Sequence, residues 1–179
     1  MTIFVTIPVP TVQDLRGRYG ATIENVLQGG QMLIVERTVE TAIPIDRVFD
    51  YLSDFTHTEE WDPGTLRTKR VDTGPIAVGA RFRNVSQFRG RETELEYRLT
   101  RLEPVRRLTF VGENKTVTST DDMRLTSTAT GTAIHYQARF AFKGVAKLAS
   151  PFLRASIEKL ADQTADQLRC ALAKLSAQP

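Results

Sequence analysis

Two tyrosines and one aspartate are the side chains in this sequence best placed to do chemistry. Tyr97 and Tyr136 each occupy an apolar face of an alternating segment, and Asp121 shares its predicted strand face with Met123. A buried tyrosine hydroxyl needs a partner, which a ligand, Asp121 or a backbone carbonyl could supply. Burial would raise the pKa of Asp121, which could then act as a general acid or base. The competing interpretation places Asp121-Asp122 at a bulge or at a strand end exposed to water.

Trp61 is the only tryptophan and precedes Asp62-Pro63. Its indole combines an apolar body with a hydrogen-bonding edge. Two interpretations fit equally: Trp61 gates the mouth of a cavity, or it plugs the core and fixes the neighbouring short helices to the rest of the fold.

Other kinds of catalysis find little support in the sequence. His57, Glu59, Glu60 and Asp62 have metal-binding side chains, but no H-E-x-x-H motif or Cys/His spacing accompanies them, so we expect a solvated loop and no metal. Cys170 falls late in the last predicted helix, and no G-x-S-x-G motif is present. A P-loop and a G-x-G-x-x-G motif are also absent, so we expect no nucleotide cofactor.

Composition indicates an ordinary globular protein. Of the 179 residues, 41% are hydrophobic and 25% charged, and the net charge is +3. Acidic and basic residues are interleaved, as in residues 89–98, so nucleic-acid binding is not expected. With one cysteine, no signal-peptide pattern and no apolar run of about 20 residues, we expect a cytoplasmic protein without a membrane span. The oligomeric state stays open between monomer and homodimer.

The chain divides at Met32. Residues 1–31 have no sustained periodicity and end in Gly29-Gly30, so we interpret them as a flexible N-terminal appendage and residues 32–179 as one domain. Met32 opens a regular strand, which leads to the hypothesis that translation starts there. The intact mass of the native protein tests this hypothesis.

Periodicity predicts the order strand, helices, strands, helix. The first strand covers 32–41, and Ile45, Val48, Phe49 and Leu52 form the apolar stripe of a helix. A short helical segment follows at 55–63. The next strands are predicted at 65–72, 79–88, 91–102, 106–112, 116–126 and 132–142. Ser150-Pro151 either begins the last helix or kinks a helix that starts near Val145.

The strands and the last helix together define an α+β fold. The connections between strands are short, which favours antiparallel pairing, and alternation within 93–99 gives the sheet one buried face. The last ~30 residues would form a helix about 45 Å long, enough to cross the whole sheet. We therefore predict about seven strands curved around a long C-terminal helix.

The stretch ERTVETAIPIDRVFDYLSDFTHTEEWDPGTLRTKRVDTGPIAVGARFR, residues 36–83, carries a family resemblance. Its V-F-x-x-L, W-D-P and G-x-x-F motifs, and the later segments 94–110 and 131–144, are similar to the polyketide cyclase/dehydrase and lipid-transport family of the START-like/Bet v 1-like (SRPBCC) superfamily. The resemblance spans about 32–176. It implies the helix-grip fold and a cavity for lipids, polyketides or other apolar ligands, and some members are cyclases or dehydratases.

A curved sheet with one helix across it leaves space for a ligand unless bulky side chains fill it. Packing of a solid core is the alternative for each side chain that faces this space. The residues expected to line the cavity are Trp61, Phe82, Leu95, Tyr97, Phe110, Met123, Tyr136, Phe152, Ile157 and Leu160.

Three functional hypotheses follow. The first is a carrier that binds a hydrophobic small molecule, lipid or polyketide-like, with one or two tyrosine hydrogen bonds setting its orientation. The second is a cyclase or dehydratase in which Tyr97 or Asp121 transfers protons. The third is a protein-interaction module, which would show an exposed apolar patch and no internal cavity.

Overall fold

The computed structural model describes residues 32–144 and 150–176. The predicted appendage 1–31 and the turn near Val145 lie outside the described residues, so the division of the chain at Met32 stays a prediction. The last helix begins at Ser150.

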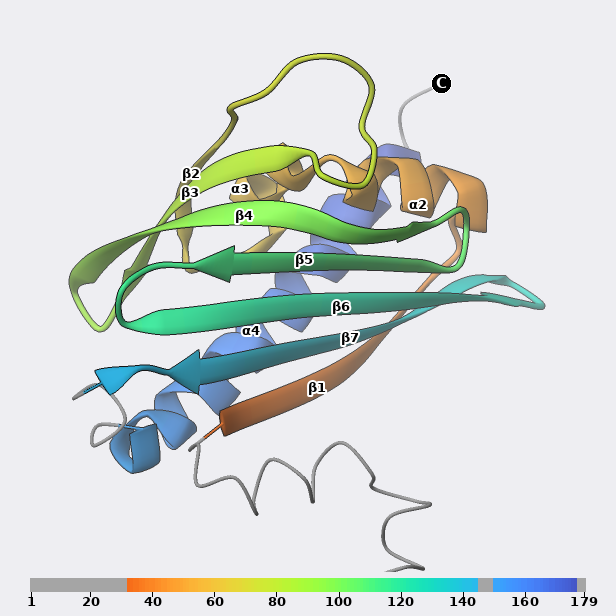
Figure 1. The fold of residues 1–179 in the computed structure, drawn as a ribbon. Coiled ribbons are helices and arrows are strands. Elements are labelled where there is room, and N and C mark those ends of the chain that lie inside the picture. Colours follow the sequence, from red (N-terminus) through yellow and green to blue (C-terminus); the bar gives the residue numbers. More distant parts are fainter. Residues whose placement is uncertain (1–31, 145–149, 177–179) are drawn as a thin grey trace, which may run out of the picture.

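Seven strands form one antiparallel sheet, as the short connections predict (Figure 1). Their order across the sheet is β1-β7-β6-β5-β4-β3-β2, so only β1 lies beside a strand distant in sequence. The strand bounds are β1 Met32–Thr41, β2 Thr65–Arg70, β3 Arg81–Phe88, β4 Arg91–Glu103, β5 Arg107–Glu113, β6 Val117–Thr128 and β7 Gly131–Phe142.

The predicted strand at 79–88 begins two residues too early. Gly79 has a φ of +99°, a left-handed conformation that belongs to the preceding turn, so β3 starts only at Arg81. The strand predicted at 65–72 likewise ends at Arg70, where its pairing with β3 stops.

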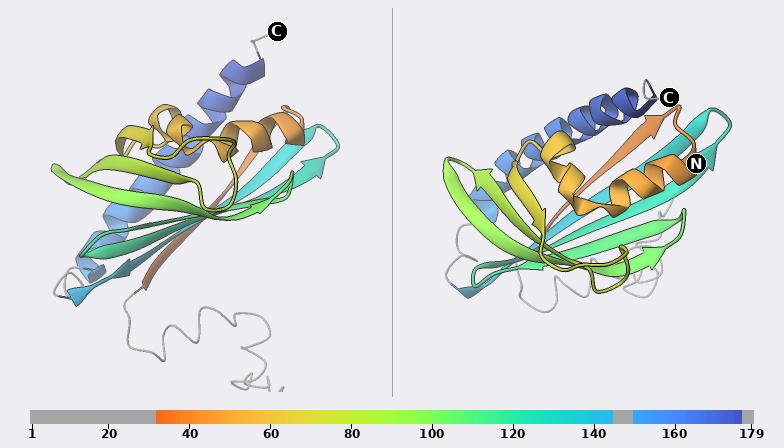
Figure 2. Two further views of the ribbon diagram at one scale, coloured as in Figure 1. Left: turned by 45° about the horizontal axis from the view of Figure 1, so that its top comes forward. Right: turned by 90° about the horizontal axis from the view of Figure 1, so that it is seen from above.

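The helices lie on one side of the sheet (Figure 2). They are α2 (Ile45–Ser53), the 3₁₀ turn η1 (Phe55–His57), α3 (Thr58–Trp61) and α4 (Ser150–Ser176). The predicted stripe of α2 is confirmed, because Val48, Phe49 and Leu52 are buried. Asp54 ends α2, and its carboxylate accepts a hydrogen bond from the Thr56 N–H that opens the next turn.

α4 crosses the concave face of the sheet diagonally and packs on β1 and α3 (Figure 1). Its buried face includes Ala161, Ala165 and Leu172, while Leu160 and Leu175 are only half-buried. The two small alanines allow the helix to approach its neighbours closely. At one end of this contact, Arg37 on β1 binds Glu158 and Asp162 on α4.

The buried apolar side chains form two clusters between the sheet and the helices. The larger one includes an aromatic group in which Phe55 contacts Phe82, Tyr97 and Phe110. The smaller one consists of Val35, Ala138, Ile157 and Ala161 with half-buried neighbours. Tyr136 packs against both clusters.

Candidate functional site

A buried carboxylate paired with a tyrosine marks the junction of the two clusters. Asp121 is 6% exposed, and its Oδ1 accepts a hydrogen bond from the Tyr136 hydroxyl at 2.5 Å. Register explains the contact: Asp121 on β6 pairs with Ala138 on β7, and Tyr136 lies two residues away on the same face. The bulge and the exposed strand end considered for Asp121-Asp122 are both wrong, because β6 continues through these residues without a register shift and buries both.

Tyr97 joins this pair from β4. Its ring lies over Gly112 on β5, the residue with which it pairs, and a Cβ on Gly112 would come within 2.6 Å of that ring. Ser119 donates a long 3.4 Å hydrogen bond to Asp121 Oδ2. Ser119 and Asp121 both affect the pKa of the Tyr97 hydroxyl. Four polar side chains therefore form one group: Tyr97, Ser119, Asp121 and Tyr136.

A second carboxylate, Asp62, faces this group from the loop after α3. Its Oδ1 accepts the Gly64 N–H at 2.9 Å, and its Oδ2 accepts the Thr65 hydroxyl at 2.7 Å. Asn84 on β3 donates in turn to Thr65 Oγ1 at 3.0 Å, which holds that hydroxyl toward Asp62. The sequence interpretation had placed Asp62 in a solvated loop, and this is wrong: the aspartate is half-buried, both of its carboxylate oxygens are hydrogen-bonded, and its charge acts on Asp121.

We define the polar cluster as Asp62, Tyr97, Ser119, Asp121 and Tyr136. Burial is the largest cause of the pKa shifts of its two aspartates and two tyrosines. It raises the pKa of Asp121 from 3.8 to about 6; the Tyr136 hydrogen bond opposes this rise and the nearby charge of Asp62 adds to it. Burial also raises the pKa of Asp62. For Tyr97 and Tyr136, burial and then the charge of Asp121 hold the pKa well above 10. Asp121 therefore exchanges its proton near neutral pH, while both tyrosines stay protonated.

Trp61 borders the cluster from the end of α3. It is 3% exposed, and its ring meets the ring of Tyr136 edge to face, with centroids 6.0 Å apart and planes at 81°. Its Nε1–H is the one buried side-chain nitrogen or oxygen without a hydrogen-bond partner in residues 32–144 and 150–176. The burial fits the core-plug interpretation, and the unpaired N–H leaves one hydrogen-bonding function unused.

The remaining predicted lining residues separate into groups. Phe82, Phe110 and Met123 are at most 1% exposed and belong to the larger core cluster, together with Leu95. Ile157 belongs to the smaller cluster, and Leu160 lies near Gly64, where a Cβ would stand 3.6 Å from its Cδ2. The side chain of Phe152 lies outside the described residues. The structure thus brings Trp61, Tyr97, Asp121 and Tyr136 together; sequence reasoning missed Ser119 and assigned Asp62 to a different group.

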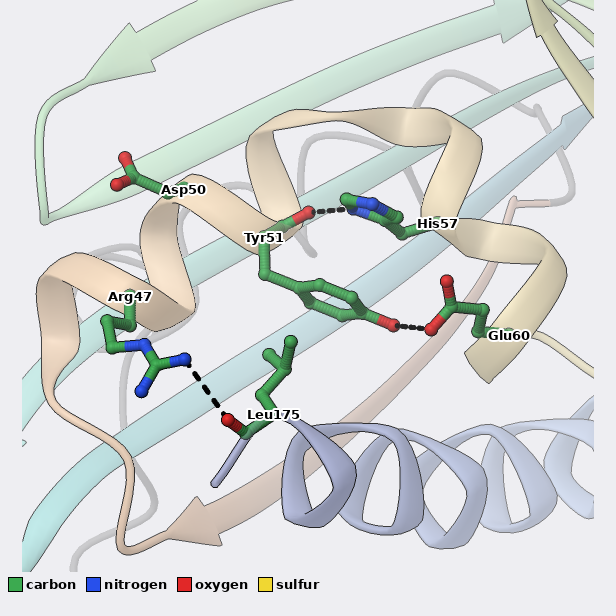
Figure 3. Close-up of a pocket in the computed structure, with 6 residues that line it drawn as sticks. All are labelled: Arg47, Asp50, Tyr51, His57, Glu60 and Leu175. Carbon is green, nitrogen blue, oxygen red and sulfur yellow. Dashed lines mark hydrogen bonds between the residues drawn. The ribbon is translucent and has the colours of Figure 1, made fainter. Parts of the chain in front are cut away.

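His57 and Glu60 line an open surface pocket of about 430 Å³ (Figure 3). Glu59 lies apart from it and accepts a hydrogen bond from the Thr68 backbone N–H at 2.7 Å. The His57 ring stacks on Tyr51, and Glu60 accepts the Tyr51 hydroxyl at 2.9 Å. Arg47 donates to the Leu175 carbonyl near the end of α4. Within the described part of the chain, no three metal-binding side chains converge.

A curved antiparallel sheet that grips a long helix, with buried and half-buried carboxylates and tyrosines at the junction of two apolar clusters, defines an α+β helix-grip protein. A family model described as polyketide cyclase / dehydrase and lipid transport matches residues 32–173. The chain belongs to this family, which confirms the resemblance found in the sequence.

Solved structures share this fold. The Zhui aromatase/cyclase from a Streptomyces species aligns with a TM-score of 0.67 and 18% identity over 80% of this chain and 95% of that one. The di-domain ARO/CYC StfQ from the steffimycin biosynthetic pathway gives 0.62 and 14% identity over 82% and 52%, and Ara h 8.0201 gives 0.59 and 13% over 82% and 99%. At these identities the likeness shows the fold alone.

No curated protein matches the chain significantly. Within the described residues, no helix is both long and apolar enough to cross a membrane.

Proposed function

We propose that the protein binds a hydrophobic small molecule, lipid or polyketide-like, between the sheet and α4. The observation that carries this proposal is the polar cluster around Asp121, buried where the two apolar clusters meet. Burying a carboxylate that must share its site with another carboxylate costs stability, and a stable core would do better with apolar residues there. A ligand site explains why such groups are kept inside.

The apolar body of the ligand would supply most of the binding free energy, at about 25 cal/mol for each Å² of apolar surface removed from water. The polar cluster would orient the ligand. Tyr97 and Tyr136 stay protonated because their pKa values are raised. Tyr136 donates its proton to Asp121, so it would offer a ligand its hydroxyl oxygen as an acceptor. The family description and the apolar side chains beside the cluster support this arrangement.

The second candidate is an enzyme of the cyclase or dehydratase type, and one observation favours it. The pKa of Asp121 is raised to about 6, so its carboxyl group could both take and return a proton near neutral pH. In that case Asp121 would remove a proton next to a carbonyl group, and Tyr97 would hydrogen-bond to the oxygen on which negative charge develops. A relative named as an aromatase/cyclase is consistent with this candidate.

Native mass spectrometry of gently purified full-length protein tests the binding proposal. We expect a species heavier than the bare chain, which loses a small apolar molecule on denaturation. A chain that carries nothing and shows no saturable binding of naphthalene-sized or fatty-acyl probes would contradict the proposal.

Paired variants separate the carrier from the enzyme. Asp121→Asn and Tyr97→Phe should abolish loss of water from a synthetic β-hydroxy thioester if the protein is an enzyme, while changing the affinity for that thioester only modestly. Asp122→Asn is the matched control for the aspartate, because Asp122 is buried but bound to Arg107 and Thr109 instead of the cluster. Tyr51→Phe is the control for the tyrosine, because its hydroxyl binds a carboxylate in the surface pocket.

A further inference from the structure

The buried polar atoms beside the two clusters are satisfied, with the exception of one donor. Within the described chain, the hydroxyl of Tyr136 is used by Asp121, and Asp62 accepts from Gly64 and Thr65. The N–H of Trp61, on an indole only 3% exposed, has no partner. Leaving a buried donor unpaired is costly, so such a group calls for an explanation.

The position of Trp61 suggests what satisfies this donor. Its ring contacts Tyr136, the residue that joins the two apolar clusters, and it precedes Asp62 directly in the chain. An indole can only donate a hydrogen bond, so its partner must be an acceptor. The packing alternative is that the N–H points at the ring face of Tyr136, which would be a much weaker contact.

The charge around this donor restricts the acceptor further. Asp62 lies close enough for its charge to act on Asp121, and no cation is among the groups that act on the pKa of either aspartate. A negatively charged ligand group placed here would meet two carboxylates in a site of low dielectric. A neutral oxygen would meet no such repulsion.

We propose that Trp61 Nε1 donates a hydrogen bond to a neutral oxygen of the ligand, such as a ketone, ester or ether oxygen, and that the site rejects carboxylate ligands. This inference rests on the proposed function, because it assumes an apolar ligand beside the polar cluster. It assigns Trp61 the role of selecting the ligand by its chemistry, in addition to packing the core.

Three probes with one ring system isolate the acceptor. 2-Acetylnaphthalene has a neutral carbonyl, 2-isopropylnaphthalene replaces the oxygen by a methyl group, and 2-naphthoate has a charged carboxylate. Each is titrated at pH 8 into ¹⁵N-labelled full-length protein, with affinity taken from the backbone amide peaks. Because Trp61 is the only tryptophan, the single indole N–H peak reports directly on the proposed hydrogen bond.

We expect the acetyl probe to bind roughly 3- to 10-fold more tightly than the isopropyl probe, which is the effect of one neutral hydrogen bond. The indole proton should move downfield with the acetyl probe only, and the naphthoate should bind most weakly. Trp61→Phe should bring the affinity ratio of the acetyl and isopropyl probes close to one, and Tyr51→Phe should leave it unchanged. If Trp61→Phe does not fold, the probe series on the unaltered chain still decides.

Equal affinity for the acetyl and isopropyl probes, with an indole proton that stays in place, would overturn this inference and leave the proposed function standing. Tightest binding of the naphthoate would overturn it in the same way. If none of the three probes binds saturably, this inference fails, and native mass spectrometry with the fatty-acyl probes then decides the proposed function separately.

Discussion

Tyr136 and Asp121 lie diagonally across the β6–β7 pair, and the tyrosine hydroxyl stands 2.5 Å from the aspartate Oδ1. Both residues come from strand interiors, so the backbone holds the two side chains in place. The pair therefore needs no loop to close over it. Its effect on the pKa of Asp121 can be measured one residue at a time.

Tyr136→Phe should raise the pKa of Asp121 above its value of about 6. The Tyr136 hydrogen bond favours the charged carboxylate and so opposes the effect of burial, and the variant removes that opposition. Titration of the Asp121 carboxyl carbon by NMR measures the shift. Tyr51→Phe serves as the control, since its hydroxyl binds Glu60 and should leave Asp121 unchanged.

The folding stability of the Asp121→Asn variant, measured relative to that of the unaltered chain, should increase as pH rises. Because the folded-state pKa of Asp121 is raised from 3.8 to about 6, the contribution of Asp121 to folding stability is fully present below pH 3.8 and is lost as pH rises through 6. The shift corresponds to about 3 kcal/mol between pH 4 and 7. Urea unfolding of both proteins across this range measures it, and parallel pH curves for the two proteins would contradict it.

Asp122→Asn should have the opposite pH dependence: its folding stability, measured relative to that of the unaltered chain, should fall as pH rises. Burial raises the pKa of Asp122, but the hydrogen bonds and charges of Arg107, Thr109 and Arg124 outweigh it and leave the pKa lowered. Asp122 therefore stabilises the fold above the unfolded-state pKa of an aspartate, and this contribution is lost as pH falls through the lowered folded-state value.

Asp122→Asn should lower the free energy of unfolding by roughly 1.5–3 kcal/mol at pH 7, the usual value of hydrogen bonds to a charged group. The same urea series, extended to pH 3, should show the stabilities of the variant and the parent chain converging in acid. A gap that widens as the pH falls would show that Asp122 does not act through its charge.

Gly112→Ala should displace the ring of Tyr97. The added Cβ would stand 2.6 Å from that ring, and Tyr97 is only 8% exposed, so the ring has little room to move. We expect a loss of about 1–3 kcal/mol in the free energy of unfolding. In a Tyr97→Ala background the same change should cost nothing, and an equal cost in both backgrounds would rule out this contact as the cause.

Much of the architecture could be predicted from the sequence, because side-chain periodicity is a local property. Alternation placed Tyr97, Asp121 and Tyr136 on buried strand faces, and the 3.6-residue period located α2 and the last helix. The W-D-P motif and the strand segments were enough to identify the family. The exact start of β3 was missed because a glycine at positive φ looks like part of a strand in a hydropathy pattern.

The meeting of particular side chains was decided only by the tertiary structure. The sequence placed Asp121 on the same strand face as Met123 but left its burial open, and the β6–β7 register decided that Tyr136 would bind it. Asp62 lies in a loop, where no periodicity indicates direction, and only its bonds to Gly64 and Thr65 hold it near the sheet. Whether the Trp61 N–H finds a partner depends on every neighbour packed around it, so no local pattern could have revealed that it has none.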